Sequence, residues 1–250
     1  MEEKGIMSLF KQKKPIMGVI HCKGTTDEEV LAKAKEEIDI YEHCGIDGVL
    51  VETYFGTYHQ VEQVLDYLQN EKKSIIYGVN CLNVDAMGFV LAKKYGCHML
   101  QIDSVGGHLK PRDDESLDAF FEYFRKDCNA YLLGGVRFKY QPVLSGRSTE
   151  EDLKICMPRC DAICVTENAT GQETSITKIE QFRNAIGDFP LFVCAGMTAE
   201  NVKDQMRIAD GGVVGSYFKD TYQDTGDVCE EHVKELMAQV WELRKEMDGK

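Results

Sequence analysis

The chain has 250 residues, of which 43% are hydrophobic and 28% are charged, so its composition excludes the disordered and fibrous classes. This length fits one domain with a core large enough to fold without disulfides or a structural metal. The formal net charge of −13 argues against nucleic acid as a partner, although it leaves room for a local cationic pocket that binds an anionic metabolite.

Residues 1–14 form an extension ahead of the first predicted strand. This extension has charges at both ends and only a short apolar group, so it lacks the hydrophobic region of a secretory signal. No apolar run in the chain approaches the roughly 20 residues that a membrane helix needs. We therefore expect a cytoplasmic protein without membrane insertion.

Short β-rich runs then alternate with longer amphipathic segments throughout residues 15–250. The pattern predicts strands at Ile16–Ile20, Gly48–Glu52, Ser74–Val79, Met99–Ile102, Tyr131–Phe138, Ala162–Thr166, Leu191–Cys194 and Gly212–Gly215. Several of these runs are continuously apolar, as expected for parallel strands that are buried on both faces. Eight such units without a dividing linker predict an α/β fold, a single-domain (β/α)8 TIM barrel, rather than two domains or an open sheet.

The segments between the strands have the apolar period of helices. The first is the clearest, because Thr26 and Glu29 have the spacing of a capping box and Gly45 is suited to end the helix. Further helices are predicted at about Tyr58–Gln69, Val84–Tyr95, Ser116–Lys126, Glu150–Met157, Ile176–Ala185, Glu200–Ile208 and Cys229–Met247. The last helix would close the ring against the first.

The ten cysteines are spread along the chain and mostly lie within apolar runs. We interpret them as buried thiols in a reducing compartment. Cys156, Cys160 and Cys164 recur at intervals of four, a spacing that fits neither zinc nor iron–sulfur motifs. The sequence therefore predicts no metal site and no cofactor.

In a (β/α)8 barrel the functional site lies at the carboxyl ends of the strands. His21, Glu52, Asn80, Asp103 and Lys139 lie at or near the ends of the first five predicted strands. His21 and Glu52 could move protons near neutral pH, Asp103 could act as a general base, and Asn80 would contact the substrate. A buried Lys139 could form a Schiff base with a carbonyl group.

These residues also have plainer interpretations. His21 could be a satisfied core histidine, and Asp103 could cap the turn that follows it. Lys139 has charged and polar neighbours, which fit an ionic or substrate-binding role better than a Schiff base. Thr166 and Glu167 begin a polar loop after the sixth strand, and Glu167 faces either a ligand or only solvent.

Small residues follow the seventh and eighth predicted strands. Gly196, Thr198, Gly215 and Ser216 would let backbone N–H groups approach a phosphate, and Thr198 could cap the next helix. Barrels of this kind commonly bind phosphate at these two loops, and Lys219 could supply a counter-charge. The alternative is that the glycines only turn the chain.

Several longer motifs occur in a specific order: Pro15–His21, Gly45–Glu52, Asp161–Gly171, Ala195–Val202 and Asp210–Ser216. Together they resemble the BtpA/SgcQ family over nearly the whole chain. The resemblance implies a barrel akin to the ribulose-phosphate-binding group, which includes phosphoribosylanthranilate isomerase, without implying that isomerase's reaction. The family is named partly for a role in photosystem I biogenesis and partly for a protein of a carbohydrate-related gene cluster.

The chain departs from the pattern of this family at the predicted mouth of the barrel. Cys22–Thr25 stand where the family usually has a Pro-rich stretch, Thr166 and Glu167 replace Thr-Gly, and Asp103 replaces the usual Asn. These departures imply that the substrate or the reaction differs from that of other members.

Two functions are consistent with these observations. We favour an enzyme that acts on a phosphorylated sugar or nucleotide-like metabolite by isomerisation, lyase or glycosyl-transfer chemistry, with His21, Glu52 and Asp103 moving protons. The alternative is a non-catalytic assembly or regulatory factor of the photosystem-biogenesis type. A homo-oligomer is compatible with either function, although no particular residue indicates one.

Overall fold

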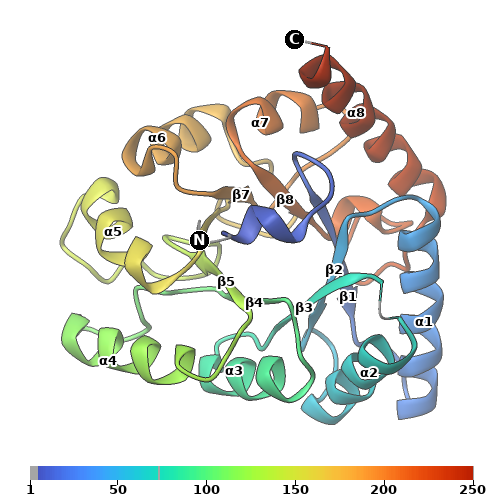
Figure 1. The fold of residues 1–250 in the computed structure, drawn as a ribbon, viewed down its shortest axis with the longest axis horizontal. Helices are drawn as coiled ribbons and strands as arrows, with labels where there is room; N and C mark the ends of the chain where they lie inside the picture. Colours follow the sequence, from blue (N-terminus) through green and yellow to red (C-terminus); the bar gives the residue numbers. More distant parts are fainter. Residues whose placement is uncertain (1–4, 73, 250) are drawn as a thin grey trace.

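The computed structural model describes residues 5–72 and 74–249, and in it eight parallel strands close into a barrel surrounded by helices (Figure 1). The strands are β1 (Ile16–His21), β2 (Gly48–Glu52), β3 (Ile76–Asn80), β4 (Met99–Ile102), β5 (Tyr131–Gly135), β6 (Ala162–Val165), β7 (Leu191–Val193) and β8 (Gly211–Val214). Each strand pairs with the next, and β8 pairs with β1 to close the ring. The predicted single-domain (β/α)8 barrel is confirmed.

The helices alternate with the strands and lie outside the ring (Figure 1). They are α1 (Asp27–His43), α2 (Tyr58–Glu71), α3 (Asp85–Lys94), α4 (Asp114–Arg125), α5 (Thr149–Cys156), α6 (Ile176–Ile186), α7 (Val202–Ile208) and α8 (Glu230–Asp248). Short 3-10 helices occur at η1 (Ile6–Leu9), η2 (Met157–Arg159) and η3 (Ser216–Phe218). As predicted, α8 packs against α1. Within the described ranges, no helix is long and apolar enough to cross a membrane.

The start of α1 differs from the predicted capping box in one bond. Thr26 Oγ1 accepts a hydrogen bond from the backbone N–H of Glu29 at 3.2 Å, as predicted. The Glu29 carboxylate, however, accepts from the backbone N–H of Thr25 at 2.9 Å. Gly45 ends the helix with φ of 75°, the left-handed conformation that glycine adopts without strain.

The fifth strand is shorter than predicted. It ends at Gly135, three residues before Phe138, because the backbone then turns through positive φ values at Arg137 (49°) and Tyr140 (61°). Lys139 therefore lies in a sharply turned loop and can approach the centre of the barrel from above the strand.

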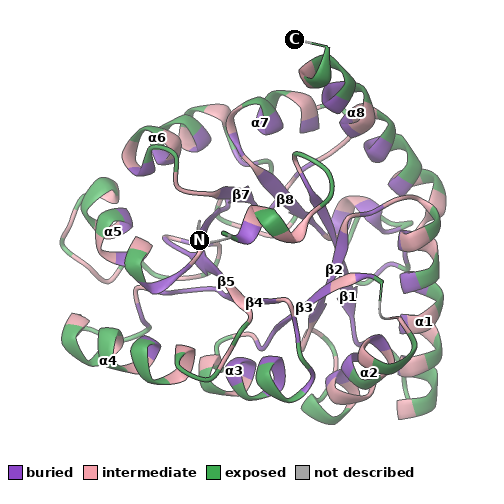
Figure 2. Ribbon diagram, viewed as in Figure 1, coloured by how far each residue is buried: buried purple, intermediate pink, exposed green. Residues whose placement is uncertain are grey.

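The core has two parts, because successive strand residues face opposite sides of the sheet. Side chains such as Val19 and Leu50 belong to a cluster inside the barrel, whereas Ile20 and Val51 pack in the layer beneath the helices. Figure 2 shows the buried strands and the exposed outer faces of the helices. Both faces of the sheet are therefore covered, as continuous apolar strands require.

The segment ahead of β1 closes one end of the barrel. Ile6 of η1 is fully buried in the interior cluster with Met17 and Phe192, and η1 crosses the ring in Figure 1. Partly buried Ile76 and Tyr131, which begin β3 and β5, pack against the same cluster. The open end is therefore the one where the strands end. Residues 1–4 of the predicted extension lie outside the described residues.

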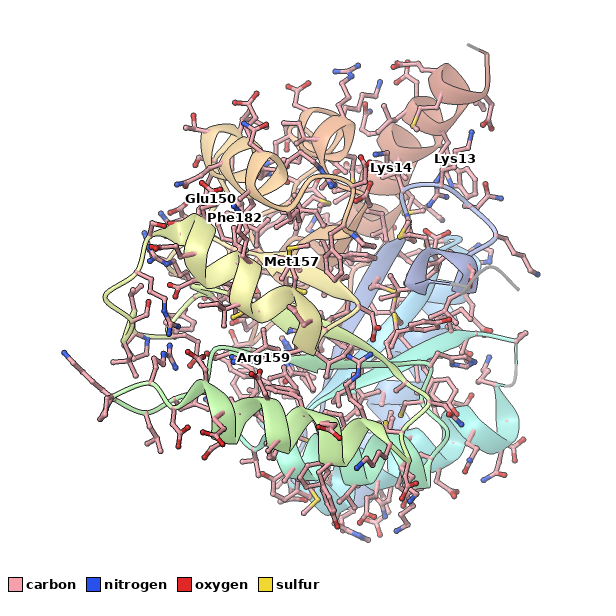
Figure 3. The ribbon with its side chains drawn as sticks, turned by 60° about the vertical axis from the view of Figure 1, so that its left-hand side comes forward. Lys13, Lys14, Glu150, Met157, Arg159 and Phe182 are labelled. Carbon is pink, nitrogen blue, oxygen red and sulfur yellow. The ribbon has the colours of Figure 1, made fainter. Side chains whose placement is uncertain are left out.

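Buried arginines connect neighbouring parts of the ring. Arg159 at the end of η2 is 2% exposed and forms ion pairs with Asp114 (2.9 Å) and Asp118 (2.6 Å) of α4. Figure 3 shows Arg159 on the side of α5 that faces α4. Arg244 of α8 pairs with Asp47 at 2.5 Å, immediately before β2. These contacts hold the helices in place around the strands.

Candidate functional site

A belt of polar side chains lies at the carboxyl ends of the first four strands. His21 pairs in register with Glu52, Glu52 with Asn80, and Asn80 with Gln101. His21, Glu52 and Gln101 lie two positions beyond Val19, Leu50 and Met99, which belong to the interior cluster, so their side chains face inward as well. The belt therefore forms one polar layer above the apolar interior.

This layer lines a cavity of about 170 Å³ between the βα loops. The cavity brings together most of the predicted site residues: His21, Glu52, Asn80, Asp103, Lys139, Gly196, Gly215 and Ser216. Residues that are distant in the sequence thus share one surface, as expected at this face of a (β/α)8 barrel.

His21 has a hydrogen-bond acceptor next to each of its ring nitrogens. Its Nε2 atom lies 3.5 Å from Glu52 Oε2, and its Nδ1 atom lies 3.2 Å from the backbone oxygen of Asp224. A doubly protonated imidazolium can donate to both groups, whereas neutral histidine can donate to one only. The rings of Tyr54 and Phe55 lie 5.1 and 5.8 Å away between centroids and fix the orientation of the imidazole.

Glu52 and Asp103 have pKa values that are shifted in opposite directions. Burial alone would raise the pKa of Glu52, but the hydrogen bond and charge of His21, helped by Lys139 and Asn80, lower it below the ordinary value. Burial, followed by the nearby Glu52 charge, raises the pKa of Asp103 against smaller opposing effects. The site therefore favours an ionised Glu52 beside an Asp103 that binds a proton more readily.

Two amide side chains hold Asp103 in place. Asn80 Nδ2 and Gln101 Nε2 both donate to Asp103 Oδ1, at 3.1 and 3.2 Å. Gln101 is 4% exposed, and its Oε1 atom has no hydrogen-bond partner among the described residues. Because both bonds are made to Oδ1, the other carboxyl oxygen is left for a proton or a ligand.

Lys139 reaches the same cavity from the loop after β5. Its backbone N–H donates to Thr166 Oγ1 at 2.7 Å, and its Nζ atom lies 5.8 Å from the centre of the Phe138 ring. Its charge acts to lower the pKa of both Glu52 and Asp103. Because Lys139 acts on both carboxyl groups through its charge, the site supports an ionic role rather than a Schiff base.

Thr166 and Glu167 do not line this cavity. Thr166 is fully buried and supports the loop of Lys139 through its hydroxyl. Glu167 lies in a groove on the outside, where its carboxylate is 3.7 Å from Lys178 Nζ. The structure therefore separates these two predicted residues from the central group.

The residues that were predicted to form a phosphate corner lie close together but differ in surroundings. Gly196, Gly215 and Ser216 line the cavity, and all three also line an adjoining open hollow of about 350 Å³ that contains Thr198. Thr198 does not cap α7, which begins at Val202 with Asn201 as its N-cap. Instead the backbone N–H of Thr198 donates to Asn201 Oδ1 at 2.8 Å, so this donor is already occupied.

The two glycines of the corner have different roles in the fold. Gly196 has φ of 65°, and a Cβ atom there would lie 2.1 Å from the backbone oxygen of Gln172. A Cβ atom at Gly215 would lie 3.8 Å from Val19, at an ordinary contact distance. Gly196 is thus needed to turn and pack the chain, whereas Gly215 leaves open space beside the cavity.

Lys219 does not supply a counter-charge to this corner, and that expectation is wrong. The side chain is 1% exposed, and its Nζ atom lies 3.0 Å from Glu37 Oε1 of α1. The adjoining hollow instead contains the acidic residues Glu200 and Glu235. In the described part of the cavity lining, the basic side chains are Lys139 and His21.

The BtpA family model matches residues 12–242. The chain belongs to the BtpA family. It is 22% identical over 240 residues to the photosystem I biogenesis protein BtpA of Synechocystis, covering 86% of this chain and 83% of that protein. It is also 28% identical over 85 residues to the sgc region protein SgcQ of Escherichia coli, covering 34% of this chain and 32% of that one.

Solved structures share the barrel with this BtpA-family chain. Native KDPGal has a TM-score of 0.68 at 11% identity, with 94% of this chain and 98% of that one covered. Phosphoribosylanthranilate isomerase from Thermotoga maritima has a TM-score of 0.59 at 13% identity, with 92% and 99% covered. At these identities the likeness shows the fold alone.

One departure from the BtpA-family pattern has a structural role at the mouth of the barrel. Lys23 lies in the stretch that the resemblance would make Pro-rich. Its Nζ atom donates to the backbone oxygens of Thr225 and Gly226 and to the Asp227 carboxylate. Lys23 therefore ties the loop after β1 to the loop between η3 and α8, which also contacts His21.

Tyr54, Gln101 and Asp224 also line the cavity, and the sequence patterns did not identify them. Gln101 carried a usable signal, because it is a polar residue at an inward position of an otherwise apolar strand. Asp224 had none. Its carboxylate accepts from the hydroxyl of Ser216 at 2.6 Å, and its carbonyl contacts His21 only because a long loop folds back over the barrel.

Proposed function

We propose that this BtpA-family protein is an enzyme that uses Glu52 and Asp103 as an acid–base pair on a phosphorylated sugar or nucleotide-like metabolite. The observation that carries the proposal is the opposite pKa shift of two carboxyl groups that line one cavity. The ionised Glu52 can accept a proton from the substrate, and Asp103 can hold one and return it. Isomerisation, lyase and glycosyl-transfer reactions can each use such a pair.

His21 and Lys139 would support this chemistry through their charge. Both side chains line the cavity beside the two carboxyl groups. A fixed positive charge stabilises the negative charge that develops on a substrate oxygen during proton transfer. Loss of either side chain should therefore slow turnover more than it weakens substrate binding.

The phosphate would dock at Gly196, Thr198, Gly215 and Ser216. These small residues connect the cavity with the adjoining hollow, and η3 follows β8 at the position where other barrels commonly bind phosphate. One of the structural relatives, phosphoribosylanthranilate isomerase, is named for a phosphorylated compound. Together these features favour a phosphorylated substrate.

The test is a thermal-shift screen with phosphorylated sugars, nucleotides and inorganic phosphate, repeated with Gly215→Ala. The added methyl group has room in the fold, because φ at Gly215 is −113° and the nearest atom is 3.8 Å away. We expect the stability of the variant to remain within about 1 kcal/mol of the wild type. Its affinity for any phosphorylated ligand should fall about tenfold or more, because the methyl group obstructs the backbone.

Gly146→Ala is the matched control, because Gly146 is exposed and a Cβ atom there would meet nothing within 4 Å. Gly196→Ala is unsuitable, since positive φ and the clash with Gln172 would destabilise the fold itself. Equal ligand affinity in Gly215→Ala and Gly146→Ala would contradict the proposed phosphate position.

The relationship to a photosystem I biogenesis protein supports a second candidate function, a non-catalytic assembly or regulatory factor. Exposed apolar side chains around the mouth, including Phe55, Leu109, Tyr140 and Tyr222, would offer a surface to a partner. Partner binding that persists in a His21→Asn and Glu52→Gln double variant would favour this function. An enzyme would lose turnover in the same variant.

A further inference from the structure

The inner end of the cavity has unmatched hydrogen-bond acceptors. Glu52 and Asp103 present carboxyl oxygens there, and Gln101 Oε1 has no partner among the described residues although the side chain is 4% exposed. Two of the nearby donors are already engaged, since His21 faces two acceptors and Asn80 donates to Asp103, and Lys139 also lines the cavity. Buried acceptors without donors are costly, so a ligand that brings donors is favoured at this end.

The charges at the inner end point to the same chemistry. Glu52 and Asp103 line the cavity, and the charge of Lys139 acts on both. The carboxylate of Asp224 lies at the other end, where it accepts from the Ser216 hydroxyl. His21 is positioned against Glu52, with Nε2 at 3.5 Å from Oε2. An ammonium group at this end would gain charge-assisted hydrogen bonds to the carboxyl oxygens of Glu52 and Asp103.

A protein-bound divalent ion is a weaker explanation for these acceptors. Among the described residues, no group of three or more His, Cys, Asp and Glu side chains is arranged to hold a metal ion. An ammonium group needs fewer ligands and can donate to the oxygens of Glu52, Asp103 and Gln101. The observations therefore favour an organic cation.

We propose that the substrate of this site carries an amino group at the end opposite its phosphate, as a phosphorylated amino sugar does. The inference rests on the proposed function, because it assumes that the phosphate docks at the Gly215 and Ser216 end of the same cavity. Glu52, Asp103 and Gln101 would bind the amino group, and the two ends of the cavity would fix the direction of the substrate.

Calorimetric titration with four matched compounds tests the inference. The compounds are glucosamine 6-phosphate, glucose 6-phosphate, glucosamine and glucose, all titrated in the presence of a metal chelator. We expect glucosamine 6-phosphate to bind about tenfold or more tightly than glucose 6-phosphate, the difference that a charge-assisted hydrogen bond supplies. Equal or weaker binding of the amino compound would overturn the inference while leaving the proposed phosphate position intact.

Two variants separate the ends of the cavity. Glu52→Gln should bring the ratio of the affinities for glucosamine 6-phosphate and glucose 6-phosphate close to one. Gly215→Ala should lower both affinities by the same factor and so preserve their ratio. If Glu52 had a purely structural role, Glu52→Gln would lower the affinity for both phosphorylated compounds alike. That result would also overturn the inference.

The unphosphorylated pair distinguishes this inference from the proposed function. If glucosamine binds as tightly as glucosamine 6-phosphate, the result would support the amino-group inference and contradict the proposed phosphate position. Binding of none of the four compounds at millimolar concentration would contradict both.

Discussion

At the scale of single residues, Glu52 and Asp103 show how surroundings separate two similar side chains. Both carboxyl groups line the same cavity, and burial opposes the charge of each. Glu52 has His21 beside it, whose hydrogen bond and charge outweigh the effect of burial. Asp103 has two neutral amides instead, and it also faces the charge of Glu52. The difference in charge therefore comes from the neighbours of each residue.

This difference predicts a pH-dependent effect of Asp103→Asn on stability. The pKa of Asp103 is raised in the folded state, so the folded protein loses stability as pH rises from the unfolded value near 3.8 through the raised value. The asparagine variant cannot ionise and avoids this loss. It should gain stability relative to wild type over that range, by about 1.4 kcal/mol for each pH unit that separates the folded and unfolded pKa values, and keep the gain at neutral pH.

Urea unfolding over a series of pH values measures this effect, and Glu52→Gln provides a comparison of opposite sign. The pKa of Glu52 is lowered, so its contribution is present above the unfolded value near 4.5 and is lost as pH falls through the folded value. Glu52→Gln should therefore be destabilised at neutral pH, with the difference shrinking in acid. A parallel pH response of the two variants would contradict the opposite shifts.

At the scale of elements, the loop between η3 and α8 is the one that completes the site. Lys219 and Val228 form an antiparallel bridge across this loop, and both contact Glu37 Oε1 of α1. Lys23 and Lys33 bind Asp227 from outside. The loop thereby holds Asp224 against His21 as a fixed wall of the cavity.

The buried pair of Lys219 and Glu37 should be the main anchor of this loop. Lys219→Met would leave the Glu37 charge buried and unpaired, at a cost of about 3–5 kcal/mol in the free energy of unfolding. Lys33→Met is the control, because its ion pair with Asp227 is partly exposed and should contribute no more than about 1 kcal/mol. Denaturant unfolding compares the two variants, and equal losses would show that Lys219 is not an anchor.

At the scale of the whole molecule, the burial of the ten cysteines shows how completely the barrel and its helices cover the interior. All ten thiols are free, and seven of them are buried. Burial raises the pKa of Cys22 and of Cys81 to about 12, so these thiols react slowly in the folded state. Cys44, Cys128 and Cys229 are half-buried.

Thiol labelling with Ellman's reagent should therefore distinguish two classes. In the folded protein we expect rapid reaction of no more than the three half-buried thiols, and in denaturant we expect reaction of all ten. Mass spectrometry of the labelled peptides identifies them. Rapid labelling of Cys164 or Cys22 in the folded protein would show that the barrel opens more readily than its packing implies.

Local patterns were enough to predict the barrel and many of the residues that line its central cavity. Apolar strand runs and helical periods depend on residues close in the chain, and a closed parallel ring follows from their strict alternation. The rule that strands end at the functional face then selected His21, Glu52, Asn80 and Asp103, which the structure places around one cavity. These positions could be predicted because strand register is set by the pattern itself.

The paths of the loops and the partners of the charged side chains could be found only from the folded chain. Lys219 and Lys139 are both lysines that follow a predicted strand, yet one is buried against Glu37 and the other faces the cavity. Asp224 meets His21 across about two hundred residues of sequence. No local pattern specifies which distant carboxylate a lysine will meet, because that choice depends on the burial and the path of several loops together.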